Sequence, residues 1–171
     1  MMPEAKSQVL AQYAPYLNQA MKDAGINTPA RQNAFIAQVA HESGQLSIMT
    51  EKASGKAYEG RKVLGNTSPG DGVKYKGRGA LQITGKEDYA AAGKALGIDL
   101  VNHPELAATP EYAFKVATWE WNKKNLNAKA DKGTAESFSQ ITKAINGCAN
   151  CPQTHADRRN ALWAHNNKVN P

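Results

Sequence analysis

Two glutamates near residue 40 have the types and the spacing of a catalytic acid and base. Glu42 stands at the end of a predicted helix, and Glu51 follows nine residues later. Apolar residues recur at helical spacing from Phe35 to Ala40, so the Glu42 side chain should leave the helix beside its buried stripe. Partial burial and the negative end of the helix dipole both favour the protonated carboxyl, which a general acid needs. We therefore predict that Glu42 donates a proton.

Glu51 has a different predicted environment. It lies beyond the helix among the polar residues Thr50, Lys52 and Ser54. A carboxylate in such surroundings stays ionised and can serve as a general base. On pattern alone, both glutamates could equally be ordinary solvated residues, one at a helix end and one in a loop.

The helix that carries Glu42 has clear start and stop signals. Thr28 can cap its first turn, and Pro29 suits the first helical position. Gly44 is typical of a helix end. These signals place Glu42 on the last turn.

Two metal-binding interpretations are incomplete. A zinc-binding helix that began with His41 would need a second histidine at position 45, which is Gln45. Cys148 and Cys151 precede His155, an arrangement open to a redox pair, a small disulfide loop or half of a zinc site. No fourth ligand is visible in the sequence. We therefore expect two thiols in a loop and no metal.

The rest of the chain is predicted to be mostly helical. After Glu51, frequent glycines and short apolar runs indicate irregular structure with a small β-hairpin. Pro15 is expected to start a second helix rather than lie inside the first one. The prediction is a mainly α domain of the α+β class, a single domain over residues 1–171. The expected helices cover residues 9–21 with a break at Pro15, 29–43, 88–96, 110–121, 134–146 and 154–163.

Composition limits the possible partners. The 171 residues include 21 Lys and Arg against 15 Asp and Glu, which gives a net charge of +6. This charge suits an anionic partner such as nucleic acid, lipopolysaccharide or bacterial cell wall. The sequence shows neither a secretory apolar core near its start nor an uncharged span of membrane length. We expect a protein made in the cytoplasm without a signal peptide, and no stable membrane insertion.

A nucleic-acid-binding protein is the alternative from a different functional class. Its phosphate-tracking strip, with one aromatic residue for stacking, would consist of Lys74, Tyr75, Lys76, Arg78 and Lys86. The other basic residues are scattered along the chain rather than gathered on one element. We therefore expect no nucleic-acid partner.

Ordered motifs run along most of the chain. They are Ala-Gln-Val-Ala-His41-Glu42-Ser-Gly, Gly70-Asp71-Gly72, Tyr75-Lys-Gly77-Arg78-Gly79-Ala-Leu-Gln82-Ile-Thr84-Gly, and Ile145-Asn146-Gly147 with Asp157-Arg158-Arg159. Together they resemble the family 19 glycoside hydrolases, which are chitinases and their phage endolysin relatives, and the compact bacterial and phage branch is the most similar. The resemblance implies a lysozyme-like helical fold and hydrolysis, with inversion, of a β-1,4-linked polymer of N-acetylated amino sugars, without a metal or cofactor.

The resemblance also implies roles for single residues. Glu42 matches the general acid, Glu51 the general base, and Thr84 the hydroxyl residue that helps to hold the attacking water. Two positions depart from the family pattern: Asp88 replaces a common asparagine, and Gly147 is followed by Cys148 rather than by a second glycine. The remaining positions match residues that accompany the acid, contact sugars, brace the glutamates or line the cleft, and they are His41, Tyr75, Arg78, Gln82, Tyr89, Asn146 and Arg158.

The expected substrate is peptidoglycan, with chitin as the alternative. The compact catalytic-only chain, its basic charge and the absent export signal favour an endolysin-type, muramidase-like enzyme that lyses bacteria. Such an enzyme would reach the cell wall after release to the periplasm. We expect it to act as a monomer.

Overall fold

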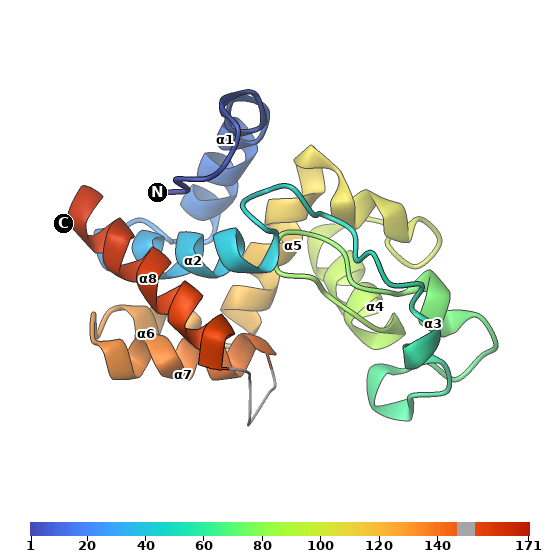
Figure 1. Cartoon of the computed structure of the whole chain (residues 1–171). Coiled ribbons are helices and arrows are strands. Elements are labelled where there is room, and N and C mark those ends of the chain that lie inside the picture. Colours follow the sequence, from blue (N-terminus) through green and yellow to red (C-terminus); the bar gives the residue numbers. More distant parts are fainter. Residues whose placement is uncertain (147–152) are drawn as a thin grey trace.

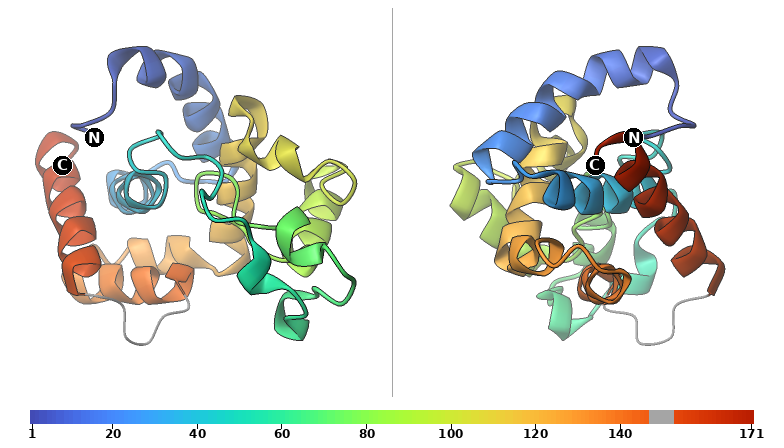
Figure 2. Two further views of the ribbon diagram at one scale, coloured as in Figure 1. Left: turned by 45° about the vertical axis from the view of Figure 1, so that its right-hand side comes forward. Right: turned by 90° about the vertical axis from the view of Figure 1, so that its left-hand side faces the viewer.

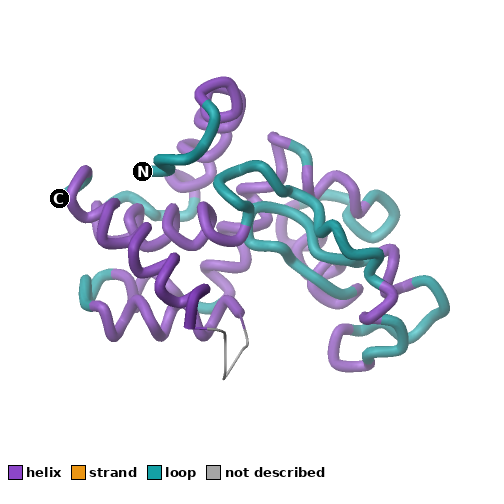
Figure 3. The backbone as a smooth tube through the Cα atoms, in the orientation of Figure 1, coloured by secondary structure: helices purple, strands orange, loops and turns teal. Residues whose placement is uncertain are grey.

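The computed structural model describes residues 1–146 and 153–171, and this part of the chain is mainly helical (Figure 1). No strand is present in the described residues; loops, drawn in teal in Figure 3, and short helical turns fill the segment between α2 and α4. The α-helices are α1 (Ser7–Asp23), α2 (Pro29–Glu42), α3 (Asp71–Lys74), α4 (Lys86–Leu96), α5 (Pro110–Lys123), α6 (Leu126–Ala130), α7 (Ala135–Asn146) and α8 (Gln153–Val169), and the 3-10 turns are η1 (Lys56–Tyr58), η2 (Lys62–Leu64) and η3 (Pro104–Ala108).

Helix α2 is the central element. Seen end-on in the left view of Figure 2, it is surrounded by α1, α5, the α6–α7 pair and α8. Its residues from Asn33 to Ala40 are all buried, because neighbouring helices cover every side of it. Thr28 caps the helix as predicted, since its Oγ1 accepts a hydrogen bond from the Arg31 backbone amide. The helix therefore presents Glu42 from a rigid support.

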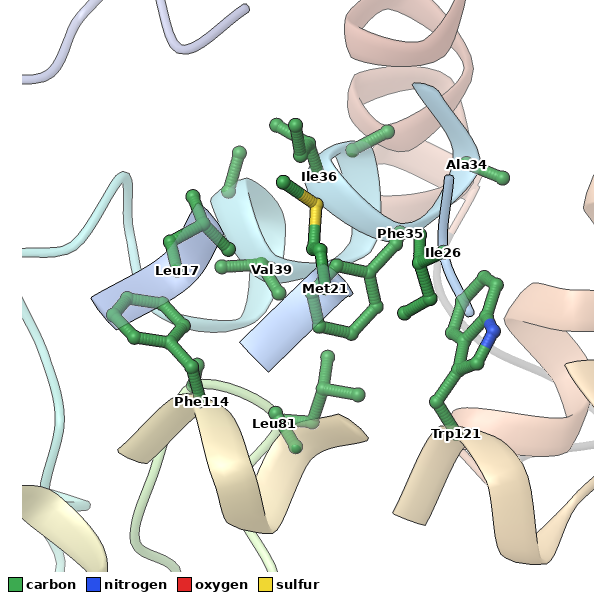
Figure 4. Close-up of a cluster of buried hydrophobic side chains, with 14 of the residues drawn as sticks. Leu17, Met21, Ile26, Ala34, Phe35, Ile36, Val39, Leu81, Phe114 and Trp121 are labelled. Atoms are coloured by element: carbon green, nitrogen blue, oxygen red, sulfur yellow. The ribbon is translucent and has the colours of Figure 1, made fainter. Parts of the chain in front are cut away.

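Two clusters of buried apolar side chains flank the middle of the molecule. The larger one joins α1, α2 and α5, with Leu81 entering from the loop before α4 (Figure 4). In it the rings of Phe35 and Trp121 meet edge to face at 5.2 Å. The smaller cluster lies beneath α4 and includes Tyr75 and Tyr89. Helix α5 contributes to both clusters, through Trp121 and Val116 respectively, and so joins them.

The predicted break at Pro15 is wrong. Helix α1 is continuous, and Pro15 lies inside it. Proline has no backbone N–H, so the carbonyl of Ala11, four residues earlier, does not receive the hydrogen bond of a regular helix. Both residues are exposed, so water can satisfy that carbonyl, while Leu17, Ala20 and Met21 anchor the helix in the core. Packing therefore overrides the local break signal.

The predicted hairpin is also absent from the described residues. Its place is taken by two isolated antiparallel bridges, Thr50 with Arg78 and Arg78 with Ile83. Gly79 and Gln82 both have left-handed backbone angles, with φ of 85° and 57°. These angles interrupt the pleat, so a regular ladder cannot extend. The segment is a tight loop pinned at single points.

Among the later helices, the start of α7 and the end of α4 agree with the prediction. Thr134 precedes α7, and its Oγ1 accepts a hydrogen bond from the Ser137 amide. Gly97 ends α4 in the left-handed conformation. Helix α8 continues to Val169, beyond the expected end at Trp163. In the described residues, no helix has the length and apolar character needed to cross a membrane.

Candidate active site

Glu42 ends α2 and is paired with an arginine from the last helix. Its Oε1 accepts a hydrogen bond from Nη2 of Arg159 at 2.5 Å, and the same Nη2 donates to Oδ1 of Asn146 at 2.8 Å. The Arg159 side chain is only 3% exposed, against 18% for that of Glu42. Arg159 thus fixes the acidic side chain from the protein side, while part of Glu42 remains open.

A cavity of about 360 Å³ opens beside Glu42. It lies where elements of both apolar clusters meet, so its walls come from distant parts of the chain. A larger hollow of about 500 Å³ elsewhere has one acidic side chain among its described lining residues, Asp131, which is bound to Arg31. We therefore identify the cavity beside Glu42 as the candidate active site from its lining side chains rather than from its volume. Its lining residues are Glu42, Leu64, Leu81, Gln82, Ile83, Thr84, Asp88, Glu120, Lys124, Ile145 and Asn146.

Glu51 is held by donors on both carboxylate oxygens. The Tyr58 hydroxyl donates to Oε1 at 3.0 Å, and the Gly77 amide donates to Oε2 at 3.0 Å. The Glu51 backbone carbonyl also accepts from Nζ of Lys76 at 3.0 Å. Because both side-chain contacts come from donors, they suit a carboxylate that accepts hydrogen bonds in its ionised form. Burial raises the pKa of Tyr58, as does its hydrogen bond to Glu51, so this phenol keeps its proton.

Gly77 lies between the predicted base and the cavity. A Cβ atom at this position would lie 3.1 Å from Oε2 of Glu51 and 3.0 Å from Oε1 of Gln82. Both contacts are tighter than a Cβ normally makes, so only glycine fits without displacing a neighbour. Gln82 lines the cavity that Glu42 also lines. Through Gly77 and Gln82, the Glu51 carboxylate is therefore adjacent to the cavity wall.

Thr84 lines the same cavity as Glu42. Its Oγ1 donates a hydrogen bond to the backbone carbonyl of Gln82 at 3.1 Å. The donor is thereby used, and the lone pairs of Oγ1 remain to accept from a water molecule. The Gln82 side chain donates to the Gly79 carbonyl at 2.8 Å. A tight turn at Gln82, where φ is 57°, brings both side chains to the cavity without a regular strand.

His41 lies behind Glu42, not among the residues that line the cavity. Its ring stands 5.4 Å from the ring of His155, and its buried Nδ1 has no hydrogen-bond partner in the described residues. Burial lowers the pKa of His41 to about 4, helped by the positive charges of Arg159, His155 and Arg158. His41 is therefore neutral at neutral pH. It adds no second cation beside Glu42.

Tyr75 and Tyr89 are placed in the core, although the family resemblance implied sugar contacts. Tyr75 is 1% exposed and donates its hydroxyl hydrogen to the Val101 carbonyl. Tyr89 is fully buried and donates to the Lys76 carbonyl, and burial raises its pKa to about 12. Neither ring is open to a polymer. Both support the loop that carries Gly77.

Arg78 and Arg158 are not next to Glu42. Nη1 of Arg78 donates to the Lys74 carbonyl at 2.8 Å and to the Tyr89 hydroxyl at 3.1 Å, so Arg78 braces the loop. Arg158 lies on the surface and pairs with Glu4. The arginine that contacts Glu42 is instead the next residue, Arg159.

The basic strip of the nucleic-acid alternative does not form. Its only aromatic residue, Tyr75, is buried and cannot stack on a base. Nζ of Lys76 is bound to two backbone carbonyls, and Lys86 pairs with Asp71 at 3.3 Å. These cations stabilise the loop rather than forming an open phosphate track. The cysteines of the possible zinc or disulfide site, Cys148 and Cys151, lie outside the described residues.

Three residues of this site were not among the predicted ones: Arg159, Tyr58 and Gly77. Arg159, Leu162 and Asn166 are buried at helical spacing on α8, but only Leu162 is apolar. The sequence of this helix therefore carries no periodic apolar signal that would have placed Arg159 on the face that packs on α2. Tyr58 and Gly77 lie in irregular backbone, where no periodic signal exists.

Comparison with known proteins gives a consistent result. A family model described as chitinase class I matches residues 11–130. An endochitinase of Arabidopsis thaliana is 40% identical over 115 residues, which cover 67% of this chain and 38% of that protein. A glycosyl hydrolase family 19 domain-containing protein of Haemophilus influenzae is 36% identical over 100 residues, covering 58% of this chain and 46% of its own. The chain thus spans less than half the length of these relatives.

The fold is shared with solved chitinase structures. Chitinase C from Streptomyces griseus aligns with a TM-score of 0.76 at 23% identity, over 98% of this chain and 76% of that chain. The predicted lysozyme-like helical architecture is therefore confirmed. Because the family model covers more than half of the chain, the protein belongs to the family 19 glycoside hydrolases, the class I chitinase family.

Proposed function

We propose that this protein hydrolyses β-1,4 glycosidic bonds between N-acetylated amino sugars by an inverting acid and base mechanism. The observation that carries the proposal is the pair of differently held carboxylates, Glu42 in the cavity lining and Glu51 separated from the lining residue Gln82 by Gly77. Glu42 lines the cavity and is fixed by Arg159. Glu51 is held by Tyr58 and Gly77, which adjoins the wall residue Gln82. Two carboxyls in unlike environments can take unlike roles.

The proton-donating step falls to Glu42. Arg159 occupies Oε1, and Oε2 is the oxygen left to carry the acidic proton towards the glycosidic oxygen. As the bond to the leaving sugar breaks, the carboxyl becomes a carboxylate. The guanidinium of Arg159 then stabilises the new negative charge where it forms.

The water-activating step falls to Glu51 and Thr84. A water that donates one hydrogen to Glu51 and the other to the Thr84 hydroxyl keeps a lone pair for the anomeric carbon. Thr84 can accept this hydrogen because its own hydrogen is bound to the Gln82 carbonyl. Glu51 removes the proton as the water attacks the face opposite the leaving group, and this inverts the anomeric centre.

Peptidoglycan is the substrate that we propose, in an endolysin-type reaction that lyses bacteria. The net charge of +6 supports an anionic polymer, because cell walls carry many carboxylates and phosphates while chitin is neutral. In this proposal the enzyme acts as a monomer, is made in the cytoplasm and reaches the wall after release to the periplasm.

Chitin is the second candidate, and a specific observation favours it. The curated relatives that match this chain include endochitinases of Arabidopsis thaliana and Beta vulgaris, at 40% and 35% identity. Both polymers contain β-1,4-linked N-acetylated amino sugars, so the same acid and base would serve.

One experiment decides between the substrates. Purified peptidoglycan and chitin are digested in parallel, and the fragments are analysed by mass spectrometry to identify the sugar with the new reducing end. Soluble fragments from peptidoglycan alone support the endolysin proposal, and fragments from chitin alone support the second candidate. The absence of fragments from both polymers would refute the proposed hydrolysis.

A further inference from the structure

A third carboxylate lies in the wall of the Glu42 cavity. Glu120 belongs to α5, is 8% exposed and lines the cavity together with Glu42 and Thr84. On the same helix, Val116 belongs to the smaller apolar cluster and Trp121 to the larger one. Glutamate is rarely buried to this extent unless a specific partner requires it.

The hydrogen bonds of Glu120 are incomplete. Its Oε1 pairs with Nζ of Lys124 at 2.7 Å, and the same Nζ donates to the Ala144 carbonyl at 2.7 Å. In the described part of the chain, the buried Oε2 has no partner. A buried carboxylate oxygen without a donor destabilises the folded state.

The ion pair with Lys124 does not account for this cost. A pair four residues apart on one helix stabilises a protein only slightly, even on a surface where neither charge is desolvated. Without Glu120, Nζ of Lys124 would still donate a hydrogen bond to the Ala144 carbonyl. The Lys124 side chain is also 27% exposed. A leucine at position 120 would fill similar volume with no unsatisfied oxygen. The fold alone therefore does not favour the glutamate.

A carboxylate can only accept hydrogen bonds, so the missing partner must be a donor. The hydroxyls and acetamide N–H groups of amino sugars are such donors. We infer that Glu120 is a substrate-binding residue, whose carboxylate turns in the cavity wall to accept a hydrogen bond from the sugar unit that enters beside Glu42. This inference rests on the proposed glycan hydrolysis and adds a specificity contact to it.

The test compares three variants on a soluble N-acetylglucosamine hexamer and on peptidoglycan fragments. Glu120→Leu removes the acceptor, whereas Glu120→Gln removes the charge and keeps an oxygen acceptor. Glu111→Gln changes an exposed acidic residue in the first turn of the same helix and serves as the matched control.

We expect Glu120→Leu to raise KM by about tenfold, with a smaller effect on kcat. Its melting temperature should equal or exceed that of the wild type, because an unsatisfied buried oxygen is removed. Glu120→Gln should recover most of the lost affinity, and Glu111→Gln should behave like the wild type. A variant that is more stable yet binds substrate less tightly is not expected from a purely structural residue.

Two results would overturn the inference. One is an unchanged KM in Glu120→Leu, which would leave the proposed hydrolysis intact. The other is a lower melting temperature with a loss of activity that Glu120→Gln does not recover, which would make Glu120 structural. If the wild type cleaves neither substrate, calorimetric titration of the hexamer into wild type and Glu120→Leu still tests whether Glu120 binds the sugar. Equal affinities would then refute the sugar contact, and weaker binding by the variant would support it.

Discussion

Glu51 and Gly77 hold each other through two hydrogen bonds. The Glu51 amide donates to the Gly77 carbonyl at 2.9 Å, and the Gly77 amide donates to Oε2 of Glu51 at 3.0 Å. One short loop thus fixes both the backbone and the carboxylate of the predicted base. Because a Cβ at residue 77 would lie only 3.1 Å from Oε2 of Glu51, a larger residue there would displace the carboxylate of the predicted base or the Gln82 side chain.

The first prediction concerns Gly77→Ala. The added methyl group should push the Glu51 carboxylate away from the water position and lower kcat by about tenfold to a hundredfold, since small displacements of a catalytic group are costly. Hydrolysis rates and melting temperature are measured together. Gly60→Ala is the control for kcat, because nothing lies within 4 Å of a Cβ there, whereas its positive φ of 65° makes a loss of stability expected in Gly60→Ala alone. Equal kcat for Gly77→Ala and Gly60→Ala would contradict the assignment of Glu51.

The second prediction concerns Glu42→Gln, which keeps the shape of the side chain and removes the acidic proton. Hydrolysis should fall by at least about a hundredfold, the range expected for loss of a general acid, while the folded structure persists. Circular dichroism checks the fold, and release of reducing ends measures the rate. A rate close to that of the wild type would show that Glu42 is not the acid.

The third prediction concerns the water beside Thr84. Thr84→Val keeps the shape but removes the acceptor, so hydrolysis should fall by about tenfold or more, and Thr84→Ser should be milder. Inversion also requires the two carboxyls to stand roughly 6.5–9.5 Å apart. Proton NMR should therefore detect the α-anomer first at the new reducing end. Early appearance of the β-anomer would instead indicate retention.

The fourth prediction separates two neighbouring arginines. Arg159→Lys keeps the charge but loses the planar group that contacts Glu42 and Asn146 through one nitrogen, so activity should fall by about tenfold or more. Arg158→Lys changes an exposed partner of Glu4 and should have little effect. Activity and thermal unfolding of both variants are compared. A larger loss of activity for Arg158→Lys than for Arg159→Lys would indicate that Arg158, and not Arg159, supports Glu42.

The fifth prediction concerns pH. The pKa of His41 is lowered to about 4 in the folded protein, chiefly by burial and also by Arg159, His155 and Arg158, and it returns to 6.5 on unfolding. Between these values the unfolded chain binds a proton that the folded chain does not. His41 should therefore lower the free energy of unfolding as pH falls from 6.5 to 4, by an amount on the order of 1–2 kcal/mol. Urea unfolding of His41→Gln at pH 7 and pH 4.5 should show a smaller decrease than the wild type. An equal decrease would mean that His41 titrates normally.

Local signals in the sequence predicted the element that carries the acid. Thr28, Pro29 and Gly44 bounded α2, and the periodicity of its apolar residues was sufficient because the helix is regular. The hairpin prediction was wrong because the chain in that segment is irregular. Glycine and left-handed residues around Gln82 produce a loop whose shape depends on distant contacts, such as the bond between the Gly79 amide and the Met49 carbonyl.

Contacts between distant residues were not predictable from local patterns. Arg159 lies 117 residues after Glu42, and nothing in the spacing of either segment specifies that they meet. Tyr75 and Tyr89 were expected to contact sugar from motif position alone, but their burial depends on the packing of α4 and α5. The family resemblance predicted the chemistry, and the three-dimensional structure shows which residues contact Glu42 and Glu51.

The pairing of α2 with α8 also determines when this protein can become active during its own synthesis. Helix α2 leaves the ribosome before α8, but Arg159 and Asn166, which contact Glu42 and the Asn33 carbonyl, belong to α8. A nascent chain that ends before α8 lacks the cation that orients the predicted acid, Glu42. Translation order thus delays the complete Glu42 environment until α8 has been made.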